Sequence, residues 1–249
     1  YLRNHLPLAT APFSMVERVT AHAFIEPPTA NRPAAVADGV NQLTGPLPAS
    51  LGNLQSLLWL DLSGNQLTGA LPPELGLLTS LTFLDLYHNA FSGAIPLALT
   101  QLPALETLDL GANGLTGPIP SELSNLVTLK NLGLCGNGLT GAIPPRLGHL
   151  VNLTVLFLCY NQLSGPIPAE VGAMTSLQSL RLDVNQLSGA IPATLGALPN
   201  LQILRLETND LSGAIPPELG QLAQLTQLWL TSNQLTGAIP ASLGRLQQL

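Results

Sequence analysis

Three residues of this chain have the types that nucleophilic catalysis uses: Ser63, His88 and Asp109. A hydroxyl, an imidazole and a carboxylate work together only when each one hydrogen-bonds the next. Such triples also arise by chance wherever a polar sheet exposes many side chains, and nothing in the local sequence ties these three together. We therefore expect no catalytic residues, no metal site and no cofactor, and the chain is predicted not to be an enzyme.

The two cysteines, Cys135 and Cys159, stand 24 residues apart, and this interval runs through the chain. Each cysteine lies two residues before an asparagine. Stepping by the same interval from Asn161 reaches an asparagine every time, at Asn41, Asn65, Asn89, Asn113, Asn137, Asn161, Asn185, Asn209 and Asn233. A register kept without insertion or deletion is the sign of a repeat array.

Leucines at fixed offsets predict one short strand in every repeat. Leu57, Leu60 and Leu62 precede Asn65 by eight, five and three residues, and the Leu-x-Leu pair has the alternation of a strand with one buried face. We expect parallel strands that end about two residues before each asparagine. The asparagine amide would then satisfy backbone groups of its own repeat and of the next one.

Glycine and proline fix the path that follows each asparagine. Glycine always stands four residues after it, as at Gly141, which suggests a position that tolerates no side chain. Proline always stands seven residues after it, so the return path should be extended rather than α-helical. Apolar residues ten and thirteen after it, such as Leu75 and Leu78, complete the core on a short 3₁₀ or irregular turn.

The pattern LxxLxLxxNxLxGxIPxxLxxL resembles the plant-type leucine-rich repeat of receptor-like kinase ectodomains and of polygalacturonase-inhibiting proteins. The resemblance covers residues 41 to 249. It implies an α/β leucine-rich-repeat solenoid, rich in β-structure, with a parallel sheet on the concave face and short 3₁₀ or irregular segments on the convex face. We divide the chain into a non-repeat leader or degenerate N-terminal cap, residues 1–35, and a solenoid of about nine repeats, residues 36–249.

The ends of the chain depart from the repeat. Ser14 and Glu17 have the spacing of a capping box, so a short helix is expected from Ser14 to Ile25. Leu249 occupies the first leucine position of a further repeat, and we interpret the chain as a fragment truncated at its C-terminus. The parent protein could therefore carry a membrane span, although no apolar run in this chain is long enough to be one.

The residues that the repeat leaves free define the candidate binding face. Strand side chains alternate, so positions six, four and two before each asparagine should point outward from the concave sheet, with the position just before it at the rim. The candidate ligand-binding residues at these positions are Trp59, Asp61, Phe83, Asp85, Tyr87, His88, Asp109, Phe157, Tyr160, Arg181, Asp183, Arg205, Glu207 and Trp229.

Charge divides this face into zones. Asp61, Asp85 and Asp109 stack at strand spacing near the N-terminal end, where their repulsion suggests a cationic ligand, whereas a solvated and screened row is the alternative. Arg181 and Arg205 stack toward the C-terminal end. Either an anionic ligand group lies between them or they form an internal ladder with Asp183 and Glu207.

The repeat register places Cys135 and Cys159 on neighbouring strands, within the Cα distance that a disulfide allows. We favour two free thiols, because a bridge between directly paired parallel positions must also meet a demanding dihedral angle. A disulfide stays open as the alternative. Asn152-Leu153-Thr154 is the one N-glycosylation sequon, and it matters only in a secreted chain.

Composition narrows the class of partner. The net charge of −6 and the single lysine, Lys130, argue against nucleic acid or an anionic membrane. We predict a protein or peptide recognition module that binds on the concave face, a receptor-like signalling fragment set outside the cell or at its surface. A secreted inhibitor of a cell-wall-degrading enzyme and a scaffold of an intracellular signalling protein are the alternatives.

Overall fold

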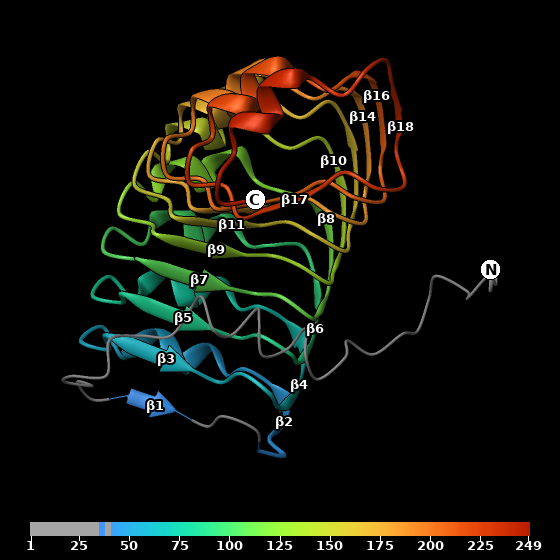
Figure 1. Ribbon diagram of the computed structural model, residues 1–249. Coiled ribbons are helices and arrows are strands. Elements are labelled where there is room, and N and C mark those ends of the chain that lie inside the picture. The colour runs from blue at the N-terminus through green and yellow to red at the C-terminus, as the bar shows by residue number, and fades with distance from the viewer. Residues whose placement is uncertain (1–34, 38–40) are drawn as a thin grey trace. The chain divides into compact units, whose positions relative to one another are not determined.

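The computed structural model of the protein describes residues 35–37 and 41–249 (Figure 1). The chain divides into two units, Tyr1–Asn31 and Arg32–Leu249, and every described residue belongs to the second. The leader expected over residues 1–35, and its helix from Ser14 to Ile25, therefore lie outside the described residues apart from Ala35.

The predicted strands stack as a nine-stranded parallel sheet, called here the first sheet. Neighbouring strands pair residue for residue at the repeat interval, so that Leu60 pairs with Leu84 and Leu84 with Leu108. The strands are β1 (Ala35–Ala37), β3 (Trp59–Asp61), β5 (Phe83–Asp85), β7 (Thr107–Asp109), β9 (Asn131–Gly133), β11 (Val155–Phe157), β13 (Ser179–Arg181), β15 (Ile203–Arg205) and β17 (Gln227–Trp229).

The strands end earlier than the sequence indicates. β3 ends at Asp61, four residues before Asn65 rather than about two. The hydrogen bonding between repeats nevertheless continues, because the Leu62 amide donates to Asp85 O at 2.9 Å and the Gly64 amide donates to Tyr87 O at 2.8 Å. Leu60 and Leu62 are both buried, as the alternation predicts.

A second nine-stranded parallel sheet follows the asparagines along one flank of the repeats (Figure 1). The prolines predicted an extended return path here, but the sequence reasoning did not foresee a paired sheet. Its strands are β2 (Thr44–Pro46), β4 (Gln66–Ala70), β6 (Ala90–Gly93), β8 (Gly114–Pro118), β10 (Gly138–Gly141), β12 (Gln162–Gly165), β14 (Gln186–Ala190), β16 (Asp210–Ala214) and β18 (Gln234–Thr236).

A short 3₁₀ helix completes each described repeat on the face opposite the first sheet, as the sequence predicts. Each of these helices begins directly after the proline that stands seven residues past the asparagine, because proline supplies the extended residue at the N-cap. The helices are η1 (Ala49–Asn53), η2 (Pro73–Leu77), η3 (Leu97–Gln101), η4 (Ser121–Asn125), η5 (Pro145–His149), η6 (Ala169–Ala173), η7 (Ala193–Ala197), η8 (Pro217–Gln221) and η9 (Ala241–Arg245).

Leucine rows from the sheets and helices form one continuous core. In the repeat of Asn65, Leu60, Leu67, Leu75 and Leu78 are all buried and all belong to this core. Since equivalent leucines in the next repeat stack directly on them, each repeat buries its apolar surface only against its neighbours. None of the helices among residues 41–249 has the length and apolar character that crossing a bilayer would need.

Two sets of glycines have different structural reasons. The glycine four residues after each asparagine has a left-handed backbone, with φ of 78° at Gly141, yet a Cβ there would meet its nearest atom only at 3.9 Å. The prediction that this position tolerates no side chain is confirmed, and the constraint is the backbone angle rather than the space around it. The position without room is on the 3₁₀ helices, where a Cβ on Gly148 would lie 2.4 Å from Glu170 O.

Candidate functional site

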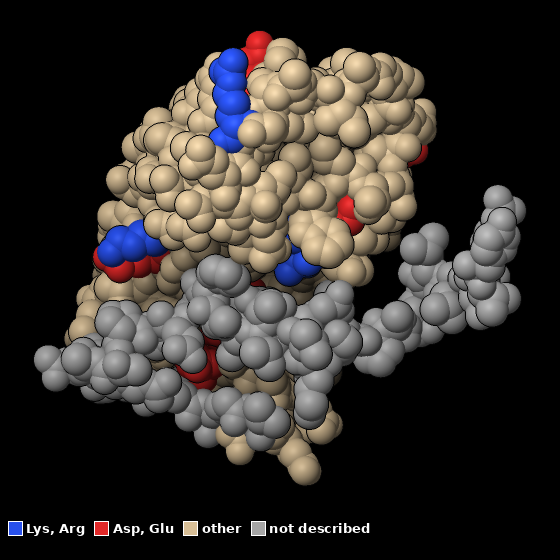
Figure 2. All heavy atoms as spheres, in the orientation of Figure 1, with Lys and Arg blue, Asp and Glu red and all other residues tan. Residues whose placement is uncertain are grey.

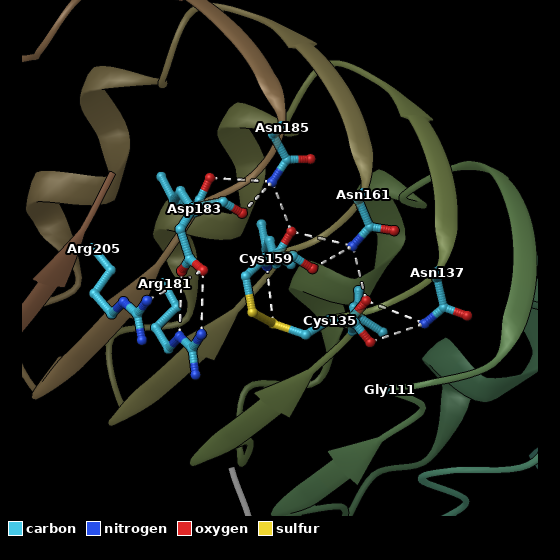
Figure 3. Close-up of a disulfide and its surroundings, with 12 residues drawn as sticks. Gly111, Cys135, Asn137, Cys159, Asn161, Arg181, Asp183, Asn185 and Arg205 are labelled. Carbon is cyan, nitrogen blue, oxygen red and sulfur yellow. Dashed lines mark hydrogen bonds and ion pairs between the residues drawn. A yellow bond between two sulfur atoms is a disulfide. The ribbon is translucent and has the colours of Figure 1, made fainter. Parts of the chain in front are cut away.

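A ladder of asparagines holds the outward face of the first sheet in place. Asn137 donates from Nδ2 to Leu134 O at 3.2 Å in its own repeat (Figure 3). It also donates to Leu110 O at 3.0 Å in the previous repeat. Its Oδ1 accepts from the Leu115 amide at 3.0 Å. The prediction that each asparagine satisfies backbone groups of two repeats is confirmed, and the rigid ladder fixes where the neighbouring side chains point.

Strand register brings the predicted charge columns together. Asp61 pairs with Asp85 and Asp85 with Asp109, so three carboxylates stand on three successive strands. Arg181 pairs with Arg205 in the same column further along the sheet. The sequence thus predicts the placement of both charge zones correctly.

The three aspartates, called here the acidic row, accept hydrogen bonds from the chain beside them. Asp85 Oδ1 accepts the Tyr87 amide at 2.9 Å, and Asp109 Oδ1 accepts the Gly111 amide at 2.8 Å. Ser63 Oγ donates to Asp61 Oδ1 at 2.7 Å. The Ser63 hydroxyl is therefore held by a carboxylate of its own repeat.

Burial and mutual repulsion raise the pKa values of the inner carboxyls. Desolvation raises the pKa of Asp85 well above its ordinary value, and the charges of Asp109 and Asp61 raise it further, against the lowering effect of the Tyr87 amide. Desolvation likewise raises the pKa of Asp109 to about 7, against the Gly111 amide. Asp85 and Asp109 are each 4% exposed, so the alternative of a well-solvated row does not describe these two.

The aromatic candidates differ in exposure. Trp59 and Phe83 stack with ring centroids 3.6 Å apart and planes 6° apart, and Phe83 is buried. Phe157 is buried as well, with the Arg181 guanidinium 5.6 Å from its ring centroid. Trp229 is 47% exposed, so it offers more aromatic surface than Trp59, Phe83 or Phe157.

The rim residues take a backbone conformation that non-glycine residues seldom adopt. His88 and Tyr160 precede their asparagines with φ of 56° and 53°. Both side chains are half-buried, and the Tyr87 and His88 rings lie 6.0 Å apart. The predicted rim is therefore a tight turn after the first sheet, and both residues border the candidate face.

Cys135 and Cys159 form a disulfide with their Cα atoms 4.5 Å apart, at the middle of the first sheet (Figure 3). The favoured expectation of two free thiols is wrong. The parallel register places the two Cα atoms within the range that a disulfide allows. Disulfides persist in oxidising compartments, so the bridge is consistent with an extracellular setting.

The arginines of the C-terminal zone already have anionic partners. Arg181 forms a bidentate pair with Asp183, from Nε and Nη2 to the two carboxylate oxygens at 3.2 Å each (Figure 3). Arg205 pairs with Glu207 through Nε at 2.8 Å and through Nη2, and its Nη2 also lies 3.9 Å from Asp183 Oδ2. The internal ladder, one of the two alternatives left open by the sequence, is what the structure contains.

This ladder is closely packed. Asp183 is fully buried between the two arginines, and the Arg205 guanidinium lies 5.2 Å from the Trp229 ring centroid. Burial would lower the pKa of Arg205, but the Glu207 hydrogen bond and the charge of Asp183 raise it above its ordinary value. Arg205 thus remains charged, and carboxylates hold both guanidinium groups in place.

Two further observations concern metal binding and surface charge. Within the part of the chain that the structure describes, no group of three or more His, Cys, Asp or Glu side chains is arranged to hold a metal ion. Figure 2 shows that most of the described surface in this view carries no charge, with a few blue and red side chains.

The sequence reasoning missed the outward row of the second sheet, although the Ser or Thr three residues after each asparagine could have revealed it.

A stack of equal repeats with an invariant frame and variable outward positions defines a solenoid scaffold of the kind that binds partners rather than transforming substrates. Residues 89–249 match the family described as leucine-rich repeat region, and residues 56–78 match the single leucine-rich repeat. The chain belongs to the leucine-rich-repeat family.

Solved plant receptor structures resemble this chain. The ectodomain of the Arabidopsis thaliana receptor kinase GASSHO1/SCHENGEN3, in complex with CASPARIAN STRIP INTEGRITY FACTOR 2, is 43% identical with a TM-score of 0.85, over 86% of this chain and 26% of that one. The Arabidopsis receptor kinase HAESA, in complex with the peptide hormone IDA and the co-receptor SERK1, is 36% identical with a TM-score of 0.79, over 83% and 35%. The chain thus spans well under half of either ectodomain.

A plant ice-binding protein is also similar, 32% identical with a TM-score of 0.74, over 83% of this chain and 66% of that one. A search of curated proteins found no match. The fold therefore resembles that of receptor ectodomains, and it also occurs in a protein with a different kind of partner.

Proposed function

We propose that this chain is part of a receptor-like ectodomain that recognises an extended peptide with a basic segment on the outward face of the first sheet. The observation that carries the proposal is the imbalance between the two charge zones. Arg181 and Arg205 are neutralised by Asp183 and Glu207, whereas none of the ion pairs among residues 41–249 involves the acidic row. A cationic ligand group would supply the missing charge.

The burial of the acidic row makes such a ligand specific. A carboxylate held away from water is costly alone, and a bound Lys or Arg side chain would relieve that cost with a charge-assisted hydrogen bond. Asp61 is half-buried and so can be reached from solvent, while Asp85 and Asp109 lie deeper. A basic side chain would therefore meet Asp61 first and lower the pKa of the inner pair as it binds.

The other part of the face suits an apolar or aromatic ligand residue. Trp229 is exposed beside the Arg205 guanidinium, and aromatic side chains of this kind are frequent binding hot spots. The arginine ladder leaves little reason for an acidic group to bind there. The proposed ligand is thus basic toward the acidic row and apolar toward Trp229.

Relatives and compartment support this reading over the alternatives. HAESA binds a peptide hormone, and its fold matches this chain closely. The disulfide is unusual for an intracellular scaffold. A secreted inhibitor would use the same acidic row against a basic enzyme surface, and binding of the intact chain to such an enzyme but not to peptides would favour it.

Paired charge removals test the proposal without reversing any charge. The probe is an extended synthetic peptide with lysines at alternate positions and a terminal tryptophan, and the same peptide with glutamates is the negative probe. Asp61→Asn combined with Asp85→Asn should weaken lysine-peptide binding about tenfold or more, roughly 1.4 kcal/mol, and should reduce its salt dependence.

The matched control is Glu122→Gln combined with Glu170→Gln, which removes the same charge from exposed sites on the 3₁₀ helices. Affinity should be unchanged in this variant. Equal weakening in both double variants would show that only net charge matters and would refute a site on the first sheet. Tight binding of the glutamate peptide to the wild type would also contradict the proposal.

A second candidate function rests on the second sheet. Each strand of the second sheet has one outward residue with a hydroxyl group. All of these residues are exposed or half-buried: Thr44, Thr68, Ser92, Thr116, Thr140, Ser164, Ser188, Ser212 and Thr236. The flanking outward positions hold Gln, Ala, Gly or Pro, with Asp210 as the one charged residue. Hydroxyls repeated at about 4.8 Å on an uncharged sheet would suit an ordered water lattice.

The similarity to a plant ice-binding protein favours the same partner, ice. Replacing Thr116 and Thr140 with lysine would interrupt the hydroxyl row, whereas Thr175→Lys changes an exposed turn beside the 3₁₀ helices. If the second sheet binds ice, the wild type and Thr175→Lys should show thermal hysteresis and the double variant should lose it. A wild-type chain without thermal hysteresis would rule this candidate out and leave the peptide proposal unaffected.

A further inference from the structure

The sequon Asn152-Leu153-Thr154 lies at the edge of the first sheet where its strands begin, on the side opposite the second sheet in Figure 1. It spans the turn between η5 (Pro145–His149) and β11 (Val155–Phe157), where the chain enters the first sheet. Asn152 is exposed, Leu153 is fully buried and Thr154 is half-buried. In Figure 1 the first-sheet strands begin at the left of the view, whereas the second-sheet strands lie along its right side.

The side-chain amide of Asn152 has a hydrogen that a sugar can replace. Asn152 Nδ2 donates one hydrogen bond, to Val127 O at 3.0 Å, and an amide nitrogen carries two hydrogens. Replacing one of these hydrogens by a sugar leaves the nitrogen with one N–H that can donate to Val127 O. The folded protein can therefore hold a glycan at Asn152 without giving up the contact that orients the side chain.

The threonine of the sequon is fixed by the fold in the same way. Thr154 Oγ1 donates to Lys130 O at 2.9 Å. Beside the sequon, polar side chains line a shallow hollow at the surface, formed by Glu106, Thr128, Lys130, Asn152, Thr154 and Ser176. Lys130 and Glu106 close one side of it with an ion pair of 2.9 Å. A hydroxyl-rich sugar ring suits such a polar surface.

From this geometry we propose that Asn152 carries an N-linked glycan when the chain passes through the secretory pathway. The donor class is a lipid-diphosphate-linked oligosaccharide with N-acetylglucosamine at its reducing end. Asn152 Nδ2 forms a bond to the anomeric carbon of that sugar, the bond from this carbon to the diphosphate oxygen breaks, and the amide releases one proton as the lipid diphosphate leaves. No oxidant or reductant is needed.

The glycan would leave both candidate binding faces open. It projects from the edge where the first-sheet strands begin, beside the hollow, and away from the hydroxyl row of the second sheet. The Cys135–Cys159 bridge is an independent sign of passage through an oxidising compartment. Protein made without the secretory pathway should bind peptides equally well, so failure of this proposal and failure of the proposed function can be told apart.

The chain supplies its own matched site. Asn200 occupies the same position two repeats later, is exposed, and donates from Nδ2 to Thr175 O at 2.9 Å, as Asn152 does to Val127. It is followed by Leu201 and Gln202, so it lacks the hydroxyl residue that a sequon needs. Thr226 shows that threonine fits at the position of Gln202, because its Oγ1 donates to the carbonyl of the preceding repeat at 3.0 Å.

The experiment expresses the full 249-residue chain behind a cleavable signal peptide in a eukaryotic host and measures intact mass before and after peptide-N-glycosidase treatment. The wild type should lose one glycan, mapped to Asn152. Thr154→Ala should abolish the glycan, whereas Thr154→Ser should retain it. Gln202→Thr should add a second glycan at Asn200, because the two positions share one geometry.

Secreted wild-type protein with the disulfide formed but no glycan at Asn152 would overturn the proposal. So would a glycan that persists in Thr154→Ala. If Gln202→Thr were secreted with Asn200 unmodified while Asn152 was modified, the claim that position in the repeat makes the site acceptable would be overturned as well.

Discussion

At the scale of single residues, the asparagine ladder concentrates stability in one side chain per repeat. Asn137→Ala removes the acceptor for the Leu115 amide and the donor for Leu110 O and Leu134 O, inside a turn with little access to water. Unpaired buried groups cost roughly 1 to 3 kcal/mol. We expect the free energy of unfolding to fall by about this amount in urea titrations.

Asn125→Ala is the control for that measurement. Asn125 is an exposed asparagine in η4 outside the ladder, and its removal should change the free energy of unfolding by less than about 0.5 kcal/mol. Equal effects at Asn125 and Asn137 would mean that helix propensity, not the ladder, determines the loss.

Asp109 gives the stability of the protein a definite pH dependence. Its pKa rises from 3.8 to about 7 on folding, so the folded state holds a proton over this range that the unfolded chain has released. The contribution of Asp109 to the free energy of unfolding is complete below the unfolded-state pKa of 3.8 and is lost as pH rises through the folded-state pKa of about 7. The thermal midpoint should therefore fall as pH is raised through this window.

Asp109→Asn should make that part of the profile shallower, since the amide is neutral at every pH, and the raised pKa of Asp85 should leave a dependence of the same sign. Asp210→Asn, an exposed aspartate of β16, should leave the profile as in the wild type. A wild-type midpoint that rises between these pH values would show that Asp109 is ionised and stabilised in the folded state, in conflict with its burial.

Sequence and structure agree at the residues where the repeat leaves no choice. The leucine rows and the asparagines are predictable because one period fixes burial and hydrogen bonding together. The arginine ladder with Asp183 and Glu207 is predictable only as an alternative, since the choice between internal and external partners depends on side-chain torsions. The prediction of two free thiols was wrong for the same reason. The register shows that Cys135 and Cys159 are adjacent, but not that their sulfur atoms are bonded.

At the scale of elements, the second sheet shows what a single repeat cannot reveal. Its strands consist of residues such as Gln66-Leu67-Thr68-Gly69-Ala70, which end in glycine and alanine, two residues that are depleted in strands. They are strands because the neighbouring repeat offers paired backbone groups, with Thr68 opposite Ala90 for instance. Because the pairing of these strands arises only between repeats, the sequence of one repeat does not predict it.

The 3₁₀ helices depend on glycine where successive repeats touch. A Cβ on Gly148 would lie 2.4 Å from Glu170 O, an atom of the backbone that cannot rotate away. Gly148→Ala should destabilise the fold by about 1 to 3 kcal/mol through overpacking. Chemical denaturation monitored by circular dichroism measures this loss.

Gly244→Ala is the matched variant, because Gly244 occupies the same position in η9 and a Cβ there would meet nothing within 4 Å. Its free energy of unfolding should be equal to or slightly above that of the wild type. If both alanine variants lost the same stability, crowding between repeats would not be the reason for glycine at this position.

At the scale of the whole solenoid, stability is a sum over neighbouring repeats. Each first-sheet strand pairs only with the strands directly before and after it, from β1 to β17. Such arrays behave approximately as one-dimensional chains, in which an outer repeat can open without the rest. Amide hydrogen exchange should therefore be slowest around β9, β11 and β13 and faster toward β17.

Two leucines at the same position test this idea. Leu132 in β9 is fully buried between two repeats, whereas Leu228 in β17 is half-buried at the last strand of the sheet. Leu132→Ala should cost about 2 to 5 kcal/mol and speed exchange through the central repeats on both sides. Leu228→Ala should speed exchange in β15 and β17 and leave β9 unchanged, because the loss reaches the centre only through intact interfaces. Uniformly faster exchange in Leu228→Ala would mean that the solenoid opens as a single cooperative unit, and the nearest-neighbour description would then be wrong.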